Sequence, residues 1–309
     1  MIRWLAGRVL VFVPVLWVVA TLTFALLRFL PGGPFDREKT LPPEILRNLE
    51  RRYALDGTLA EQYADYLGRL ARFDLGPSYK YVGRDVSDIL ADALPVSVQL
   101  GLLALAIALG GGVALGLAAG ARRGSGIDRG VGLATLVGVS APSFVIGAGL
   151  ILGVALGLDW LPAGLWESPA FAVLPALTLA ALPLAYIAQL TRAQVAAVMD
   201  QDYVRTARAK GVPEGRVRRH HVLRNALLAV LTYFGPLLAM LLTGSFVVEK
   251  IYAIPGMGRF FVTAVTNRDY PLVLGVTLVY AALVLVANLL VDLLYAWLDP
   301  RIRVAPDRR

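Results

Sequence analysis

The sequence contains no cysteine, and its only two histidines, His220 and His221, are adjacent. The absence of cysteine excludes disulfide frameworks and metal sites that need a thiolate ligand. Two neighbouring histidines are also a poor basis for a metal site. Both lie in a strongly basic stretch rather than in an apolar run, so serine hydrolase chemistry within a membrane is excluded as well.

Charged residues are scarce. They make up 17% of the 309 residues, whereas a soluble domain has about a quarter. Hydrophobic residues reach 57%, and the net charge is +8. This composition predicts an integral membrane protein with a basic surface.

Six stretches lack charge and are long enough to cross a bilayer. They have 19 to 29 residues each, and a spanning helix needs about 20. The first is longer than the apolar core of a signal peptide and no cleavage pattern follows it, so it is expected to be retained. The predicted fold class is therefore an all-α membrane protein with six transmembrane helices, at 9–27, 93–121, 130–158, 168–191, 225–248 and 270–291.

Lysine and arginine are distributed unevenly among the connections. Segment 192–224 has eight and the connection 122–129 has three, whereas 158–168 has none and 249–269 has three. Because positively charged short loops stay in the cytoplasm, both termini and segment 192–224 are predicted to be cytoplasmic. The C-terminal tail adds four arginines to that side, Arg301, Arg303, Arg308 and Arg309.

The long connection after the first span has a helical pattern of its own. Thr58 and Glu61 have the spacing of a capping box, and Pro43-Glu44 is typical of another helix start. Apolar residues follow each start at helical spacing: Leu59, Tyr63, Tyr66, Leu67 and Leu70 after the first, and Ile45, Leu46, Leu49 and Tyr53 after the second. Residues 31–95 are therefore predicted to form a small extracytoplasmic helical lobe.

Two glycine series recur at intervals of four residues inside the apolar runs. One is Gly112, Gly116 and Gly120, and the other is Gly149, Gly153 and Gly157. Small residues on one helix face allow a second helix to approach closely. Both series are expected to pack within this chain rather than to form a dimer interface.

A charged stretch, DYVRTARAKGVPEGRVRRHHVLRN at 202–225, lies between two apolar runs. Asp200 and Asp202 are suitable N-caps for a helix over Tyr203 to Lys210. Gly211 suits the left-handed residue after that helix, and a second helix is predicted to start at Pro213-Glu214 and to continue into the fifth span.

Such a short capped helix beneath the membrane exposes small side chains and a tight glycine turn. It is suited to docking in a groove of another protein rather than to enclosing a ligand. The alternative, a solvated basic loop, explains the arginines but not the caps or the spacing of alanine and glycine.

The stretch resembles the cytoplasmic E-A-A-x-x-x-G loop of ATP-binding-cassette (ABC) importer permeases, in which Arg205-Thr206-Ala207 and Gly211 occupy the frame. The sequence DYVRTARAKG…RRHHVLRNALL is similar to that of the dipeptide, oligopeptide and nickel permeases in particular. A departure is Ala229, where that family usually has proline. Further matches follow in the family's order: LPGGPFD (30–36), YALDGTLAEQYADYLGRL (53–70), DLGPSY (74–79), APSFVIG (141–147), LDWLPAG (158–164), EKIYAIPGMGRFF (249–261) and LVDLLYAWLDPRIR (290–303).

The resemblance implies a type I ABC importer permease in the plasma membrane of a bacterium or archaeon. Residues 1–30 would hold the N-terminal tail and first helix, 31–95 the lobe, and 96–309 the permease core. It also implies four kinds of partner: a second homologous permease, two ATPases that use ATP and Mg²⁺, an extracytoplasmic substrate-binding protein, and membrane lipid. No catalytic residue, no cofactor bound by this chain and no nucleic acid are expected. Consistent with this, no lysine follows a glycine, so a P-loop cannot form.

Two groups of site residues follow from the resemblance. In segment 202–211, Ala207 and Gly211 are expected to contact the ATPase. Arg205, Arg208 and Lys210 are expected to form a charged rim around this contact, and Tyr203 is expected to anchor it. The same segment also includes Asp202, Thr206 and Ala209. In the IPGMG turn, the residues expected near an outward-facing gate are Pro255, Gly256 and Gly258.

The cargo is left open among dipeptides, oligopeptides, nickel chelates, glutathione and oligosaccharides, with peptides favoured. A rival hypothesis is a proton-coupled secondary transporter, which needs a carboxylate deep in a span. Asp292 is the only candidate; it lies seven residues before Asp299, about 10 Å inside the cytoplasmic end, and a structural role is favoured. A nucleic-acid patch at His220 and His221 is weighed against a positive-inside loop, and the loop is favoured.

Overall fold

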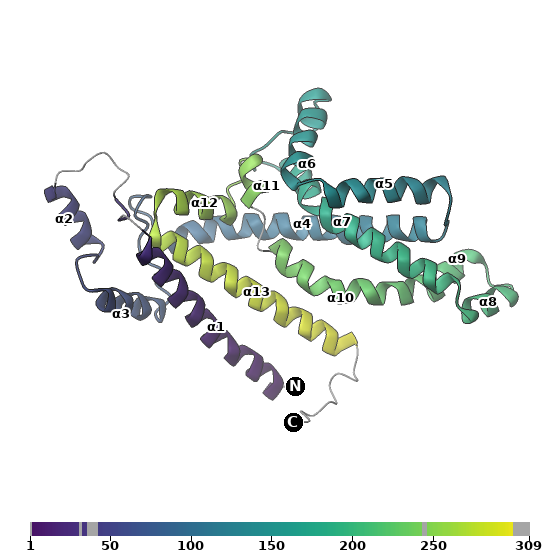
Figure 1. The fold of residues 1–309 in the computed structure, drawn as a ribbon, viewed down its shortest axis with the longest axis horizontal. Coiled ribbons are helices and arrows are strands. Elements are labelled where there is room, and N and C mark those ends of the chain that lie inside the picture. The colour runs from purple at the N-terminus through teal and green to yellow at the C-terminus, as the bar shows by residue number, and fades with distance from the viewer. Residues whose placement is uncertain (1, 31–32, 36–42, 243–245, 299–309) are drawn as a thin grey trace. The chain divides into compact units, whose positions relative to one another are not determined.

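The computed structural model describes residues 2–30, 33–35, 43–242 and 246–298, and their regular secondary structure is helical apart from one isolated bridge between Pro77 and Asp85 (Figure 1). In chain order the elements are α1 (Ile2–Phe29), α2 (Pro43–Arg52), α3 (Leu59–Leu70), α4 (Val86–Gly120), α5 (Gly126–Ser140), α6 (Ser143–Leu150), the π-helical η1 (Ile151–Gly157), α7 (Pro169–Met199), α8 (Asp202–Ala209), α9 (Glu214–Arg216), the π-helical η2 (Val217–Val222), α10 (Leu223–Leu242), α11 (Phe246–Ile251), α12 (Met257–Asn267) and α13 (Tyr270–Leu298).

The helices confirm the predicted all-α membrane fold. Five segments of the described chain are long and apolar enough to cross a membrane: Gly7–Phe29, Val86–Gly120, Pro169–Met199, Ala229–Ile251 and Tyr270–Leu293. A sixth span exists if the bent pair Gly126–Ser140 and Ser143–Gly157 counts as one. The arginines of the C-terminal tail, Asp299 and part of the fifth predicted span, 243–245, lie outside the described residues.

The third predicted span, 130–158, is not one straight helix. Its two halves, α5 and α6 with η1, are bent by 113°. Pro142 causes the break, because a proline disfavours helical backbone in the residue before it; Ala141 accordingly has φ −82° and ψ 127°. A run without charge therefore predicted the length of this segment but not its shape.

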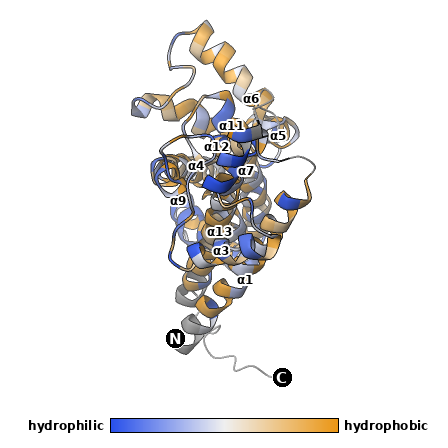
Figure 2. Ribbon diagram, turned by 90° about the vertical axis from the view of Figure 1, so that its left-hand side faces the viewer, coloured by the Kyte–Doolittle hydropathy of each residue, from blue (hydrophilic) through white to orange (hydrophobic). Residues whose placement is uncertain are grey.

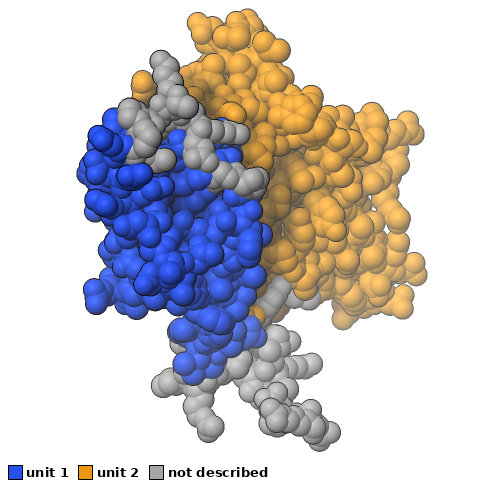
Figure 3. Space-filling model, turned by 60° about the vertical axis from the view of Figure 1, so that its left-hand side comes forward, with its two compact units in different colours: residues 1–97, 255–289, 293–309 blue, residues 98–254, 290–292 orange. Residues whose placement is uncertain are grey.

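The chain divides into two compact units (Figure 3), and each is described by itself. The first contains residues 1–97, 255–289 and 293–309, and the second contains 98–254 and 290–292. The predicted division at residues 30 and 95 stays a prediction.

In the first unit, α2 and α3 form where the lobe was expected. The capping box is confirmed: the Thr58 hydroxyl accepts a hydrogen bond from the backbone N–H of Glu61, and the Glu61 carboxylate accepts one from the N–H of Thr58 at 2.7 Å. The core of this unit includes Phe24, Ile89 and Val276, with tyrosines of the lobe packed against it.

A buried carboxylate, Asp269, ties the loop before α4 to the start of α13 in the first unit. It accepts hydrogen bonds from the Ser78 hydroxyl and from the backbone N–H of Tyr79 at 3.1 Å. It also accepts one from the N–H of Leu272 at 3.4 Å, in the first turn of α13. Each of these bonds offsets part of the cost of burying a charge.

In the second unit, α5, α6, α10 and α11 all contact α7 (Figure 1). The first glycine series packs within the chain as predicted, since it lets α4 approach α7 closely. A Cβ atom at Gly116 would lie 2.5 Å from the carbonyl oxygen of Ala188 and 2.5 Å from Cβ of Thr191.

The second glycine series does not pack as expected. A Cβ atom at Gly149 or Gly153 would meet no heavy atom within 4 Å, and one at Gly157 would meet only the carbonyl oxygen of Leu152 in its own helix. This segment is hydrophobic (Figure 2), and its large side chains are exposed in the isolated chain, for example Leu152 and Leu156. Glycine spacing alone therefore does not show which helix face is covered.

Candidate functional site: the α8 segment and its glycine turn

The helix predicted after residue 200 is present as α8, but its N-cap differs from the prediction. Gln201 occupies the N-cap without a side-chain hydrogen bond, while Asp200 is the C-cap of α7. Asp202 is the first helical residue, where a carboxylate interacts favourably with the helix dipole. The prediction of Asp200 and Asp202 as caps was therefore wrong, although the helix starts where expected.

The end of α8 confirms the predicted glycine turn. Gly211 has φ +77°, a left-handed conformation that favours glycine. Its N–H donates to the carbonyl of Arg208 at 2.9 Å, and the N–H of Val212 donates to the carbonyl of Ala207 at 3.2 Å. These two bonds define a Schellman motif.

The second predicted helix is also present. Pro213 is the N-cap of α9, and the chain continues helically through η2 into α10. Ala229, the departure from the family pattern, lies inside α10. Segment 202–242 is therefore a helical hairpin whose short arm is α8.

The inner face of α8 is packed against its own chain. Val204 and Ala207 are buried in a cluster with Val217, Val222 and Ala226, and Val212 packs against it. Ala207 is only 8% exposed, which differs from the expectation that its side chain faces a partner. The exposed residues of the segment are Asp202, Tyr203, Arg205, Thr206, Ala209, Lys210 and Gly211.

Arg208 braces the glycine turn instead of forming an open rim. Its Nε and Nη2 atoms donate to the two carboxylate oxygens of Glu214 at 3.1 and 2.8 Å. These hydrogen bonds lower the pKa of Glu214 and raise the pKa of Arg208. Because the pKa of Glu214 is lowered by folding, the pair stabilises the turn above the ordinary glutamate pKa, and this contribution is lost as the pH falls through the lowered value.

Tyr203 links α8 to the start of α10. Its hydroxyl accepts a hydrogen bond from Nδ2 of Asn225 at 2.7 Å, and the same amide nitrogen donates to the carbonyl of His221 at 3.0 Å. The ring remains 43% exposed. Tyr203 therefore fastens the hairpin and still presents an aromatic surface.

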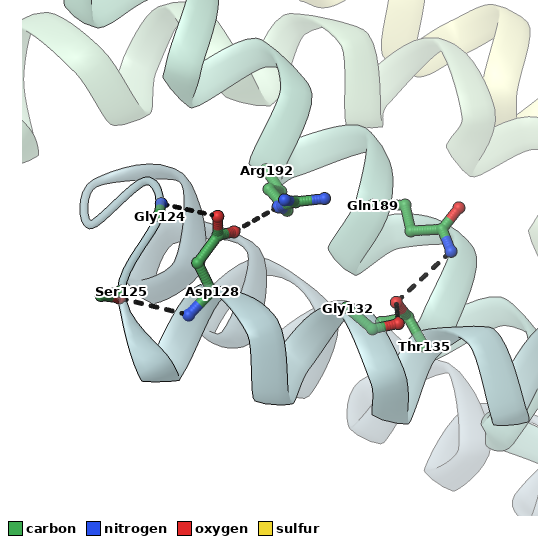
Figure 4. A network of polar contacts seen from close by, with 7 residues as sticks. All are labelled: Gly124, Ser125, Asp128, Gly132, Thr135, Gln189 and Arg192. Atoms are coloured by element: carbon green, nitrogen blue, oxygen red, sulfur yellow. Dashed lines mark hydrogen bonds and ion pairs between the residues drawn. The ribbon is translucent and has the colours of Figure 1, made fainter.

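A polar network fixes α7 shortly before it leads into α8 (Figure 4). Arg192 of α7 donates through Nε to Asp128 of α5 at 2.5 Å, and Asp128 also accepts from the N–H of Gly124 at 3.0 Å. Ser125 caps α5 by accepting from the N–H of Asp128, and one turn further Gln189 donates to Thr135 at 3.3 Å. The Asp128 side chain is 8% exposed and that of Arg192 41%.

Removing the charge of Asp128 is expected to destabilise the second unit. Asp128→Asn weakens the hydrogen bonds that Asp128 accepts from Arg192 and Gly124, so we expect a lower free energy of unfolding. The measurement is the thermal unfolding midpoint of the purified protein in detergent. A matched control is Asp200→Asn, whose pair with Arg123 is solvent-exposed at 3.4 Å and should contribute less than about 0.5 kcal/mol. Equal losses in the two variants would contradict this interpretation.

The second group of predicted residues belongs to the other compact unit. Gly256 is the N-cap of α12, so the IPGMG turn begins a short helix as expected. The N–H of Met257 donates to the Ser97 hydroxyl at 2.9 Å, and Pro255 is exposed while Gly256 and Gly258 are buried. Its place beside a gate stays a prediction.

Two features of the α8 segment were missed by sequence reasoning. The spacing of Val204 and Ala207 places both on one face of α8, but it does not show that this face packs against the chain. The pair between Arg208 and Glu214 crosses a glycine turn, and no helical spacing rule points to it. The pair between Asp128 and Arg192 is 64 residues apart, so no local pattern indicates it.

The fold and this hairpin define a multi-pass membrane protein in which the short helix α8 packs against η2 and the start of α10. Residues 112–304 of this chain match the protein family described as the inner membrane component of binding-protein-dependent transport systems. The chain belongs to this family: it is a transport subunit and not itself an ATPase, and the family binds no cofactor of its own. A system of this type also includes a partner permease, ATPases and a binding protein. Membership rules against the secondary-transporter hypothesis based on Asp292.

Individual relatives match over nearly the whole chain. The dipeptide transport system permease protein DppB of Bacillus subtilis (strain 168) is 42% identical over 304 residues, covering 98% of this chain and 99% of that protein. The oligopeptide transport system permease protein OppB of Escherichia coli (strain K12) is 41% identical over 305 residues, covering 98% and 100%. A crystal structure of an amino acid ABC transporter with histidines has a TM-score of 0.53 at 21% identity, covering 67% of this chain and 93% of that one, which shows a shared fold.

Proposed function

We propose that this permease serves an ATP-driven importer of peptides, and that α8 with its Gly211 turn is the point where ATPase motion enters the chain. The cargo is supported by the relatives named for dipeptide and oligopeptide transport. The observation that carries the coupling role is the Schellman turn at Gly211. It ends a helix whose inner face is packed on its own chain and whose outer face is exposed.

The contacts of α8 support its use as a lever. Val204 and Ala207 fix its inner face, Tyr203 holds α10, and Arg208 closes the turn onto Glu214. A force on the outer face would therefore move α8 together with η2 and the start of α10 instead of unfolding it. ATP binding and hydrolysis in two partner ATPases would drive this motion and alternate the access of the pathway.

The orientation that we propose follows from the charge distribution, and the partners follow from the family. Segment 192–224 faces the cytoplasm in this proposal, with both termini on the same side and the lobe outside. A second homologous permease completes the pathway, an extracytoplasmic protein delivers cargo, and lipid surrounds the spans. The turn at Pro255, Gly256 and Gly258 would border the outer gate.

A cysteine placed at Ala209 is expected to crosslink to the partner ATPase. Ala209 is exposed on α8, and the natural chain has no cysteine that could compete. The measurement is the yield of covalent permease–ATPase adduct in membrane vesicles with a short thiol-reactive crosslinker. Because the ATPases are cytoplasmic, a positive result also assigns the side of segment 202–211.

Two control positions make the result specific. Ala207→Cys lies in the same helix but is buried, and it should give several-fold less adduct than Ala209→Cys. Arg122→Cys is exposed in the short turn before α5 and should also give less. No adduct at Ala209, or equal adduct at Arg122, would remove the support for α8 as the docking helix. Competition of labelled dipeptide uptake by unlabelled peptides, nickel chelates or oligosaccharides would test the cargo separately.

A further inference from the structure

A cavity of about 90 Å³ lies inside the first unit, and the hollow that includes its open mouth is about 710 Å³. Five segments line it: the end of α1, the end of α2, α3, the loop 75–79 and the start of α13. The α8 segment belongs to the other unit, so this cavity is a separate feature.

The charge around the cavity is positive. Three arginines and one acid line it, namely Arg28, Arg52, Arg69 and Asp65. Asp65 is paired with Arg69 at 3.0 Å. In the part of the chain that the structure describes, Arg28 and Arg52 have no carboxylate partner, which leaves an uncompensated positive charge for an anion.

Aromatic rings hold Arg28 at the cavity. The centre of its guanidinium group lies 5.3 Å from the ring centroid of Phe24 and 5.6 Å from that of Tyr270. Contacts of this kind hold the cation over the ring faces without using up its hydrogen-bond donors. Burial raises the pKa of the neighbouring Tyr79 to about 12, although Arg28 lowers it, so Tyr79 stays neutral and does not neutralise Arg28.

Two buried polar atoms of residues that line the cavity lack a hydrogen-bond partner among the described residues: the Tyr66 hydroxyl and Oε1 of Gln62. Nε2 of Gln62 donates to the carbonyls of Leu55 at 3.0 Å and Gly57 at 2.8 Å. These two acceptors use both amide hydrogens and direct Oε1 away from them. A buried polar atom without a partner is costly, and a ligand that supplies an acceptor and a donor would satisfy both atoms.

We propose that this cavity binds the carboxylate end of a small molecule that carries an N–H group next to it, as an amino acid or the C-terminus of a short peptide does. Arg28 pairs with the carboxylate, with Arg52 near it, and the Tyr66 hydroxyl donates to one carboxylate oxygen. Oε1 of Gln62 accepts from the N–H. Arginine is well matched to carboxylates in charge and geometry.

The size of the cavity supports a terminus rather than a whole ligand. An apolar cavity of about 150 Å³ accepts benzene, with its six carbon atoms, so a volume of 90 Å³ suits about four heavy atoms. A carboxylate with its α-carbon has that size. The rest of the ligand would extend through the open mouth of the cavity, so the ligand's own side chains would have little influence on binding.

The test uses the complete transporter in phosphatidylcholine nanodiscs, without binding protein and without ATP, so that it is independent of transport and of the crosslinking result. Calorimetric titration with glycylglycine should show binding. Glycylglycine amide, which lacks the carboxylate, should bind at least about 10-fold more weakly, as expected for the loss of a charged partner. Inorganic phosphate and nanodiscs with added phosphatidylglycerol distinguish a phosphate or lipid site from a carboxylate site.

Two variants assign the binding to this cavity. Arg28→Gln should weaken glycylglycine binding by about 10-fold or more, and Tyr66→Phe, which removes only the hydroxyl, by about 3- to 10-fold. Arg72→Gln, an exposed arginine of the same lobe that does not line the cavity, should leave binding unchanged. The proposal is overturned if acid and amide bind equally, if phosphate or phosphatidylglycerol occupies the site in place of the acid, or if Tyr66→Phe, folded by its unfolding midpoint, binds as the natural protein does.

Discussion

Gly211→Val is expected to leave the permease folded and inserted but to reduce ATP-driven transport by about 10-fold or more. Gly211 has φ +77°, and a left-handed backbone costs a residue with a Cβ atom roughly 1–2 kcal/mol, more when it is β-branched. If this cost weakens the coupling between permease and ATPase, a loss of 1.4 kcal/mol corresponds to a tenfold change in the coupling equilibrium. The chain can avoid this cost only by moving the end of α8, which breaks the Schellman bonds to Arg208 and Ala207.

The measurements are co-purification of the ATPase and uptake by reconstituted vesicles. Gly215→Val is the matched control, because a Cβ atom at either glycine meets no heavy atom within 4 Å and only Gly211 has a positive φ. Normal uptake in Gly211→Val, or an equal defect in Gly215→Val, would show that the left-handed turn is not what the coupling requires.

Gly116→Val is expected to have a larger effect, on folding itself. A Cβ atom at Gly116 would lie 2.5 Å from the backbone oxygen of Ala188, so α4 and α7 would have to separate. Overpacking of this kind usually costs 1–3 kcal/mol, and a clash with backbone costs more, so we expect at least about 3 kcal/mol. For a chain of 309 residues that lowers the unfolding midpoint by roughly 5 °C.

The second glycine series provides the control. Gly153→Val makes the same substitution in an apolar helix with the same spacing, but at a position where a Cβ atom meets nothing within 4 Å. Its midpoint should change by less than about 2 °C, which is within the range of ordinary surface substitutions. Equal destabilisation of the two variants would mean that helix propensity, and not contact with α7, determines the result.

Features that depend on neighbouring residues could be predicted from the sequence. The capping box at Thr58 and the left-handed Gly211 are governed by backbone hydrogen bonds within one or two turns. The lengths of the apolar helices follow from the absence of charge. The break at Pro142 was also readable in principle, because proline restricts the residue before it, but counting uncharged residues does not detect it.

Features that depend on tertiary contacts could not be predicted. The direction of Ala207 is determined by its packing against Val217 and Val222, and helical spacing alone gives two opposite faces without saying which is buried. The two glycine series have the same spacing and opposite environments for the same reason. Arg28 and Tyr66 belong to one cavity only because segments far apart in the sequence fold against each other.

The break between α5 and α6 has a consequence for hydration. Each half has 15 residues, Gly126–Ser140 and Ser143–Gly157, or about 22 Å of helix, which is shorter than the hydrocarbon core of about 30 Å. Neither half is therefore long enough to cross the bilayer alone. If the pair forms one span, the last carbonyl groups of α5 lie within the membrane, where lipid offers them no hydrogen bond. Beside them is a cavity of about 420 Å³ whose lining includes Ser140, Ser143 and Thr178. Irregular backbone inside a membrane requires protein or water as its partner, so a broken span would make the carbonyl groups at the end of α5 depend on the polar groups of this cavity or on water within it.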